Sequence, residues 1–124
     1  MGGTTKTDKK IMGEIKIQYW RENGVYTSLY LELVCVDRQS PLGKAHGQDW
    51  SVLQDGKRAT SEADMEWNFC AGAVGWQDYL AETCARLLRE TDCDSIYPDS
   101  VGLRYYLCED PNHDHLCLVN QKVP

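Results

Sequence analysis

Residues Gly13–Val36, GEIKIQYWRENGVYTSLYLELVCV, decide the fold that the sequence predicts. Apolar and polar side chains alternate on both sides of Asn23–Gly24, a dipeptide typical of tight hairpin turns. A three-residue Glu-Asn-Gly loop pairs Ile17 with Leu29 and keeps the aliphatic side chains of both strands on one face. A one-residue slip would invert that pattern, so this register is favoured. The stretch therefore predicts a β-hairpin whose opposite face is polar and aromatic.

A second hairpin is predicted in residues 101–123, VGLRYYLCEDPNHDHLCLVNQKV. An even loop centred on Asn112 and His113 places Cys108 directly opposite Cys117, because residues that face each other across a hairpin are paired in register. In this register the leucines share the core face, and the two cysteines lie on the other face.

The segment between the hairpins combines loop and helix signals. Asp37–Ala59 is punctuated by glycines and a proline, which predicts a long connection with a short strand at 49–54 and a turn at Asp55–Gly56. Residues 61–70 begin with a helix-capping serine and predict a short helix. Trp76–Glu90 has apolar residues at helical spacing and predicts a long amphipathic helix.

These elements predict an α+β fold. An antiparallel sheet of two β-hairpins, with a short fifth strand, packs against one long and one short helix in the order β-β-(loop)-α-α-β-β. The 124 residues fit one domain. Residues 1–12 are expected to be a disordered N-terminal tail, and residues 13–124 a single α+β domain.

The composition limits the partners and the location. Thirteen basic residues against 19 acidic ones give a net charge of −6, which argues against direct binding to nucleic-acid phosphates. The sequence contains no apolar run long enough to cross a bilayer and no secretory signal at its start. A cytoplasmic, reducing location is therefore predicted, in which the six cysteines are thiols.

The aromatic face of the first hairpin is the candidate binding surface. Tryptophan and tyrosine are favoured anchors in protein interfaces, and acidic charge attracts a basic partner. The predicted binding residues are Trp20, Tyr26, Tyr30, Glu32, Trp50 and Tyr106. They favour a small acidic non-enzymatic protein that engages a basic protein partner, as inhibitor and immunity proteins do, or a second copy of itself. In one alternative, the aromatic side chains line a pocket for a small cationic ligand. In another, the 37–59 segment covers this face as a second small core.

The tip of the second hairpin is the densest group of reactive side chains. Cys108, His113, His115 and Cys117 are the residue types that zinc binds. Their spacing lacks the short Cys-x-x-Cys motif of known zinc hairpins, so a cross-strand disulfide and two reduced cysteines remain alternatives. No catalytic residue is assigned. A thiol or metal enzyme at this tip is the third-ranked function, and no cofactor other than zinc is indicated.

Overall fold

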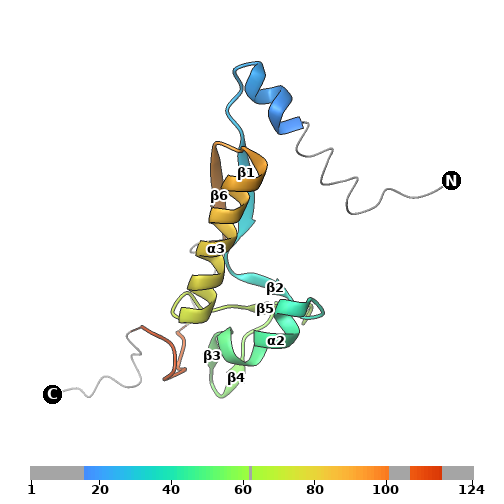
Figure 1. Cartoon of the computed structure of the whole chain (residues 1–124). Coiled ribbons are helices and arrows are strands. Elements are labelled where there is room, and N and C mark those ends of the chain that lie inside the picture. The colour runs from blue at the N-terminus through green and yellow to red at the C-terminus, as the bar shows by residue number, and fades with distance from the viewer. Residues whose placement is uncertain (1–15, 62, 101–106, 116–124) are drawn as a thin grey trace. The chain divides into compact units, whose positions relative to one another are not determined.

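A computed structural model describes residues 16–61, 63–100 and 107–115 of the chain. It is a mixed α/β structure with three helices and small two-stranded sheets in these residues (Figure 1). Residues 16–22 are helical, and the later elements are β1 (Ser28–Glu32), β2 (Cys35–Asp37), α2 (Pro41–Trp50), β3 (Leu53–Gln54), β4 (Lys57–Arg58), β5 (Glu66–Asn68), α3 (Val74–Thr91) and β6 (Ser95–Asp99). None of the described helices is long and apolar enough to cross a membrane.

The contacts divide the chain into two compact units. Unit 1 contains the described residues 16–31 and 82–97, and unit 2 contains the described residues between 32 and 81 together with 98–100 and 107–115. Helix α3 contributes its first half to unit 2 and its second half to unit 1.

The first predicted hairpin is wrong, because residues 16–22 form a helix. Asn23–Gly24 ends this helix instead of turning a hairpin. Gly24 has a φ of +72° and donates its N–H to the carbonyl of Arg21, while Val25 donates to the carbonyl of Trp20. This pair of bonds is the glycine C-cap known as the Schellman motif. The Asn-Gly dipeptide suits a helix C-cap as well as a tight hairpin turn, since both require a residue in the left-handed region.

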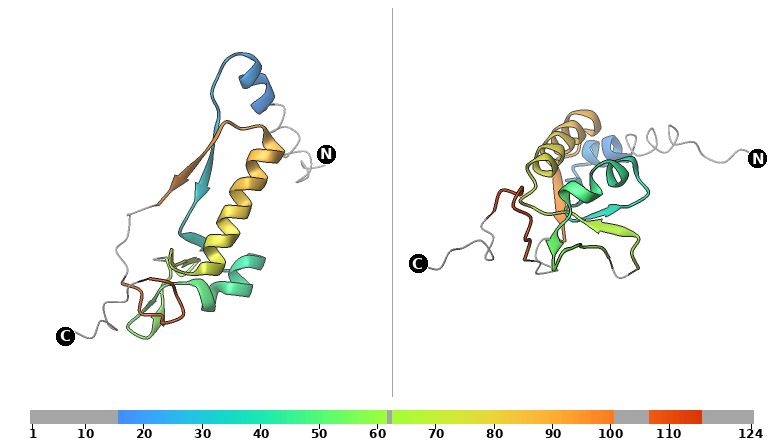
Figure 2. Two further views of the ribbon diagram at one scale, coloured as in Figure 1. Left: turned by 60° about the vertical axis from the view of Figure 1, so that its left-hand side comes forward. Right: turned by 90° about the horizontal axis from the view of Figure 1, so that it is seen from below.

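Strand β1 pairs with β6, far along the chain, and not with a hairpin neighbour. At one end the carbonyl of Thr27 accepts the N–H groups of Asp94 and Ser95. At the other end the carbonyl of Asp99 accepts the N–H of Leu33. The partners advance in the same direction, so the pair is parallel, as the arrows in Figure 2 show. A parallel pair needs a crossover connection, and α3 lies within it.

Unit 2 contains two antiparallel pairs. In the β2–β5 pair, Val36 lies opposite Trp67. Strands β3 and β4 form a short hairpin around Asp55–Gly56, whose φ values of 52° and 74° are those of a tight type I′ turn. The predicted turn is confirmed, but the strand predicted at 49–54 is limited to Leu53–Gln54, because Asp49 and Trp50 belong to helix α2.

The predicted long connection over 37–59 is wrong, because helix α2 and strands β3 and β4 together occupy most of it. Ser40 caps the helix by accepting the N–H of Gly43, and Pro41 stands in the first turn. The glycines that suggested a loop instead permit close packing. A Cβ on Gly47 would overlap the indole ring of Trp67.

The predicted short helix at 61–70 is also wrong, because residues 66–68 form strand β5. The strand is buried on both faces, since Trp67, Asn68 and Phe69 are all buried. Asp64 has a positive φ, and its side chain bonds the hydroxyl of Thr60. The tight turn before β5 therefore replaces the expected helix start.

The long helix is confirmed as α3, which runs from Val74 to Thr91. Its Trp76 is buried and donates its indole N–H to the carbonyl of Leu33. The ring packs edge-on against Phe69, with ring centroids 4.9 Å apart. The buried core cluster of unit 2 is Val36, Val52, Trp67, Phe69, Cys70, Ala73 and Trp76.

Most of the predicted second hairpin lies outside the described residues, which omit 101–106 and 116–124. The described part, 107–115, contains turns and bends but no strand. Two backbone hydrogen bonds join it to other parts of unit 2: Glu109 donates to the carbonyl of Leu53, and Asp114 donates to the carbonyl of Gly72.

Candidate functional site

Four cysteine and histidine side chains of unit 2 converge on one point. Their donor atoms all lie within 4.8 Å of one another, and the residues are Cys70, Cys108, His113 and His115. Cys70 follows β5, and the other three belong to the 107–115 segment. Cys108, His113 and His115 were predicted from the sequence as metal ligands. The fourth predicted ligand, Cys117, lies outside the described residues.

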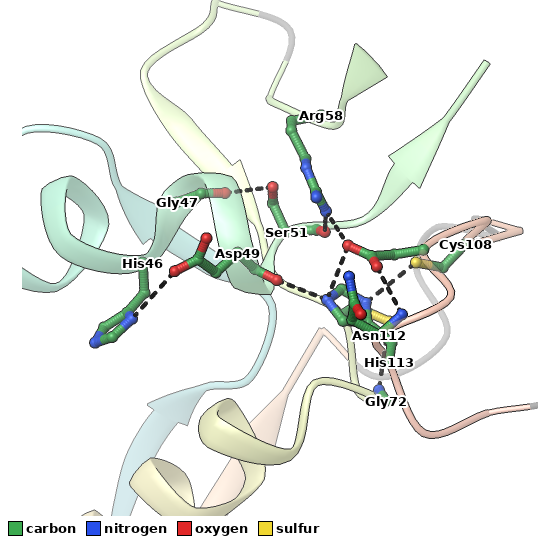
Figure 3. A network of polar contacts seen from close by, with 11 residues as sticks. His46, Gly47, Asp49, Ser51, Arg58, Gly72, Cys108, Asn112 and His113 are labelled. Carbon is green, nitrogen blue, oxygen red and sulfur yellow. Dashed lines mark hydrogen bonds and ion pairs between the residues drawn. The ribbon is translucent and has the colours of Figure 1, made fainter. Parts of the chain in front are cut away.

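The imidazole of His113 has a defined orientation (Figure 3). Its Nδ1 lies 3.3 Å from the sulfur of Cys108. Its Nε2 lies 2.7 Å from the backbone carbonyl oxygen of Asp49, to which it donates, because a carbonyl only accepts. This contact through Nε2 leaves Nδ1 directed toward the sulfur of Cys108.

Asp110 stands behind His113 and is 2% exposed. One carboxylate oxygen lies 2.7 Å from a guanidinium nitrogen of Arg58 and 3.5 Å from His113 Nε2, and the other accepts the N–H of Asn112. Burial opposes the charge on this carboxyl group. The Asn112 N–H, Arg58 and His113 outweigh burial and hold the pKa of Asp110 below its ordinary value.

Arg58 connects this carboxylate to the neighbouring backbone. The same guanidinium nitrogen donates to the carbonyl of Ser51 at 2.8 Å, and the Ser51 hydroxyl bonds the carbonyl of Gly47 at the end of α2. Figure 3 shows the resulting chain of contacts from α2 through β4 to the 107–115 segment. The cluster therefore rests on a polar network that is largely buried.

Cys70 and His115 meet at Gly72. The Gly72 N–H points to the Cys70 sulfur at 3.3 Å. A Cβ at Gly72 would overlap the His115 ring, so glycine permits the imidazole to lie against the backbone. Nε2 of His115 is buried and has no hydrogen-bond partner. Burial, reinforced by the neighbouring Cys108, raises the pKa of Cys70 to about 12.

Unit 1 carries an exposed aromatic surface that the sequence predicted in part. Tyr26 is 73% exposed, and Tyr30 and Tyr97 are each 59% exposed. The rings of Tyr30 and Tyr97 lie on the paired strands β1 and β6, with centroids 6.3 Å apart and planes tilted by 39°. We call Tyr26, Tyr30 and Tyr97 the tyrosine surface. Tyr97 was missed because the Ile-Tyr-Pro sequence around it was not interpreted as a strand.

Of the other predicted binding residues, Glu32 lies two residues beyond Tyr30 on β1, whereas Trp20 and Trp50 lie on other elements. Trp20 is 49% exposed on helix 16–22. Trp50 belongs to unit 2, where it packs against the core cluster and stacks on His46 with ring centroids 3.7 Å apart. Glu32 accepts the N–H of Val34 and the hydroxyl of Ser100. Tyr106 lies outside the described residues.

The acidic excess and the tyrosine surface belong to different units. The described residues of unit 1 include four basic and five acidic side chains, so that unit is nearly neutral. Those of unit 2 include four basic and eleven acidic side chains.

The fold and the two candidate sites define a small mixed α/β domain with a cysteine-histidine cluster and an exposed tyrosine pair. The chain belongs to the family described as domain of unknown function (DUF6259), whose model matches residues 9–117. A search of curated proteins found no match.

A solved structure shares the fold. It is the noncanonic maltogenic alpha-amylase AmyB from Thermotoga neapolitana, which is 20% identical, with a TM-score of 0.62. The match covers 82% of this chain and 23% of the amylase chain. This chain therefore spans about a quarter of the length of that enzyme.

Proposed function

We propose that this chain is a non-catalytic binding domain that recognises a carbohydrate through the tyrosine surface of unit 1. The observation that carries the proposal is the adjacent, exposed pair Tyr30 and Tyr97. The face of a phenol ring is electron-rich and attracts the C–H groups on the flat side of a sugar ring. Two rings tilted by 39° form a shallow corner against which one or two sugar units can pack.

Polar groups next to the tyrosines suit the hydroxyls of a sugar. The hydroxyls of Ser28 and Ser95 lie 2.9 Å apart. Each serine stands two residues before one of the tyrosines on the same strand. Side chains two residues apart on a strand share a face, so these hydroxyls accompany the rings. A binding surface with apolar rings and a few placed hydroxyls is the pattern expected for a neutral, amphipathic ligand.

The charge distribution supports a neutral ligand over the basic protein or small cation predicted from the sequence. Long-range attraction of a cation requires a concentration of negative charge near the contact surface. The described residues of unit 1 carry four basic and five acidic side chains. Glu32, the carboxylate two residues beyond Tyr30 on β1, already accepts hydrogen bonds from the N–H of Val34 and the hydroxyl of Ser100. The likeness to part of a maltogenic amylase makes α-glucans the first ligands to test.

Protein binding is a second candidate, favoured by the surface of helix 16–22 and the turn that follows it. Tyr19 is 63% exposed there, and Trp20 and Val25 are also exposed. Exposed aromatic and aliphatic side chains in one short segment are typical of a contact with another protein or domain.

The test is a titration with maltoheptaose followed by NMR shifts of the tyrosine ring signals. We expect binding near 1 mM, which corresponds to about 4 kcal/mol. Loss of one stacking ring, in Tyr30→Ala or Tyr97→Ala, should weaken it by about 1 kcal/mol, or five- to tenfold. Tyr19→Ala is the matched control, since it removes an equally exposed tyrosine outside the surface.

The outcomes separate the candidates. Carbohydrate binding at this surface would be refuted if the tyrosine ring signals stayed unchanged at about 10 mM maltoheptaose. Equal losses of affinity in all three variants would refute it as well. Capture of a protein that is lost in Trp20→Ala but kept in Tyr97→Ala would favour the second candidate.

A further inference from the structure

We propose that Cys70, Cys108, His113 and His115 bind one zinc ion in a closed, structural site of unit 2. Two thiolates and two imidazoles form one of the commonest donor sets for structural zinc. In a tetrahedral site with zinc–sulfur bonds of about 2.3 Å and zinc–nitrogen bonds of about 2.0 Å, neighbouring donors are about 3.3–3.8 Å apart. All the donor atoms here are within 4.8 Å of one another. Small side-chain movements therefore suffice to bind an ion.

The surroundings of His113 match those of a zinc ligand. A metal-bound histidine commonly donates its second ring N–H to a carbonyl or carboxylate, which fixes the tautomer and the ring orientation. Nε2 of His113 contacts the Asp49 carbonyl at 2.7 Å and the Asp110 carboxylate at 3.5 Å. Its Nδ1 is directed to Cys108 at 3.3 Å. The ring is therefore already oriented for coordination through Nδ1.

His115 provides an independent indication. Its Nε2 is buried without a hydrogen-bond partner, a condition that native structures rarely leave unexplained. Coordination of an ion by this nitrogen would satisfy it. Gly72 supports the same centre twice, because it gives space to the His115 ring and directs its N–H to the Cys70 sulfur. Hydrogen bonds of this kind stabilise the charge of metal-bound thiolates.

The donor set also indicates which ion binds and what it does. Thiolates with imidazoles favour zinc over magnesium or calcium, which prefer oxygen ligands. Four protein ligands complete a tetrahedron, so no position is left for water or substrate, as a catalytic zinc would require. The role is therefore structural. The ion joins the 107–115 segment, which has no helix or strand of its own, to the turn after β5.

The experiment measures the zinc content of the full chain by mass spectrometry after expression with added zinc. We expect one zinc per chain in the wild type and in the control Cys84→Ser, a cysteine of α3 outside the cluster. Cys108→Ser and His115→Ala should lose most of it. Cobalt added to the metal-free protein should give the intense visible bands of a tetrahedral site and a sulfur-to-cobalt charge-transfer band.

Cys117→Ser tests the assignment of the ligands. It should keep its zinc, and loss of zinc would overturn the set of four named above. Variants that fail to fold are replaced by a measurement on the wild type, in which a mercurial that titrates thiols should release one zinc per chain. A wild type without stoichiometric zinc that also fails to bind added zinc or cobalt would overturn the proposal.

Discussion

The buried pair of Arg58 and Asp110 makes a quantitative prediction about stability. Arg58→Met keeps most of the side-chain volume but removes the guanidinium that lies 2.7 Å from a carboxylate that is 2% exposed. Removal of one partner of a buried ion pair costs about 3–5 kcal/mol, because the remaining charge loses its compensation. Arg58 itself is about one-fifth exposed. We therefore take the lower end of that range, roughly 3 kcal/mol.

The loss of a second bond adds to this cost. The same guanidinium donates to the Ser51 carbonyl at 2.8 Å, and a hydrogen bond of this kind contributes about 1 kcal/mol. The total, about 4 kcal/mol, corresponds to a fall in Tm of roughly 12 °C for a chain of this size. Thermal unfolding followed by circular dichroism at pH 7 measures it. Lys57→Met, an exposed change at the preceding residue, is the control and should be nearly neutral.

A double-mutant cycle tests the cause. With Asp110→Asn added, the buried charge is gone, so the double variant should be more stable than the sum of the two single changes by about 2–3 kcal/mol. Strict additivity, or a loss below about 1 kcal/mol in Arg58→Met, would show that the pair does not stabilise the fold in this way.

Three further predictions follow from individual contacts. Asp110→Asn should weaken zinc binding about 10- to 100-fold through the orientation of His113, measured by competition with a chromogenic chelator. Gly47→Ala should destabilise the chain by about 2 kcal/mol in urea unfolding, because the added Cβ overlaps Trp67, and an unchanged midpoint would contradict this packing. Gly24→Ala should cost about 1 kcal/mol in urea unfolding, since the left-handed C-cap there has a φ of +72°, and no loss would argue against the helical end.

The elements that depend on local signals alone were predictable from the sequence. Trp76–Glu90 is confirmed as α3 because its apolar spacing fits only a helix of that length. Asp55–Gly56 is confirmed as a turn because both residues tolerate positive φ. Asn23–Gly24 was misinterpreted because a left-handed residue serves a helix end and a hairpin equally well.

Elements that depend on tertiary packing were not predictable in the same way. Gly43 and Gly47 suggested a loop, yet each is buried where a helix approaches another part of the chain closely. Residues 66–68 became a strand because β2 supplies their hydrogen bonds from a distant part of the sequence. Propensity within one segment carries no information about such a partner.

The residues of the candidate metal site were also predictable only in part. Cys108, His113 and His115 were indicated by their density in one short segment. Cys70 reaches the cluster only through the fold, and its own surroundings in the sequence contain no ligand motif. The Asp49 carbonyl that orients His113 is a backbone atom, and no residue type signals it.

The acidic side chains of the described residues are concentrated in unit 2. The described residues of unit 2 carry an excess of seven acidic over basic side chains. Two of its four cations are engaged internally, because Arg58 pairs with Asp110 and Arg38 lies 4.4 Å from the centre of the Trp67 ring. Negative charge that is not offset raises the affinity of nearby groups for cations and opposes the formation of thiolates. A divalent ion bound by two cysteines would offset part of this negative charge. It would also lower the pKa of both thiols and so stabilise the thiolates. The composition that first suggested a basic protein partner is thus equally the composition that favours a metal cation in unit 2.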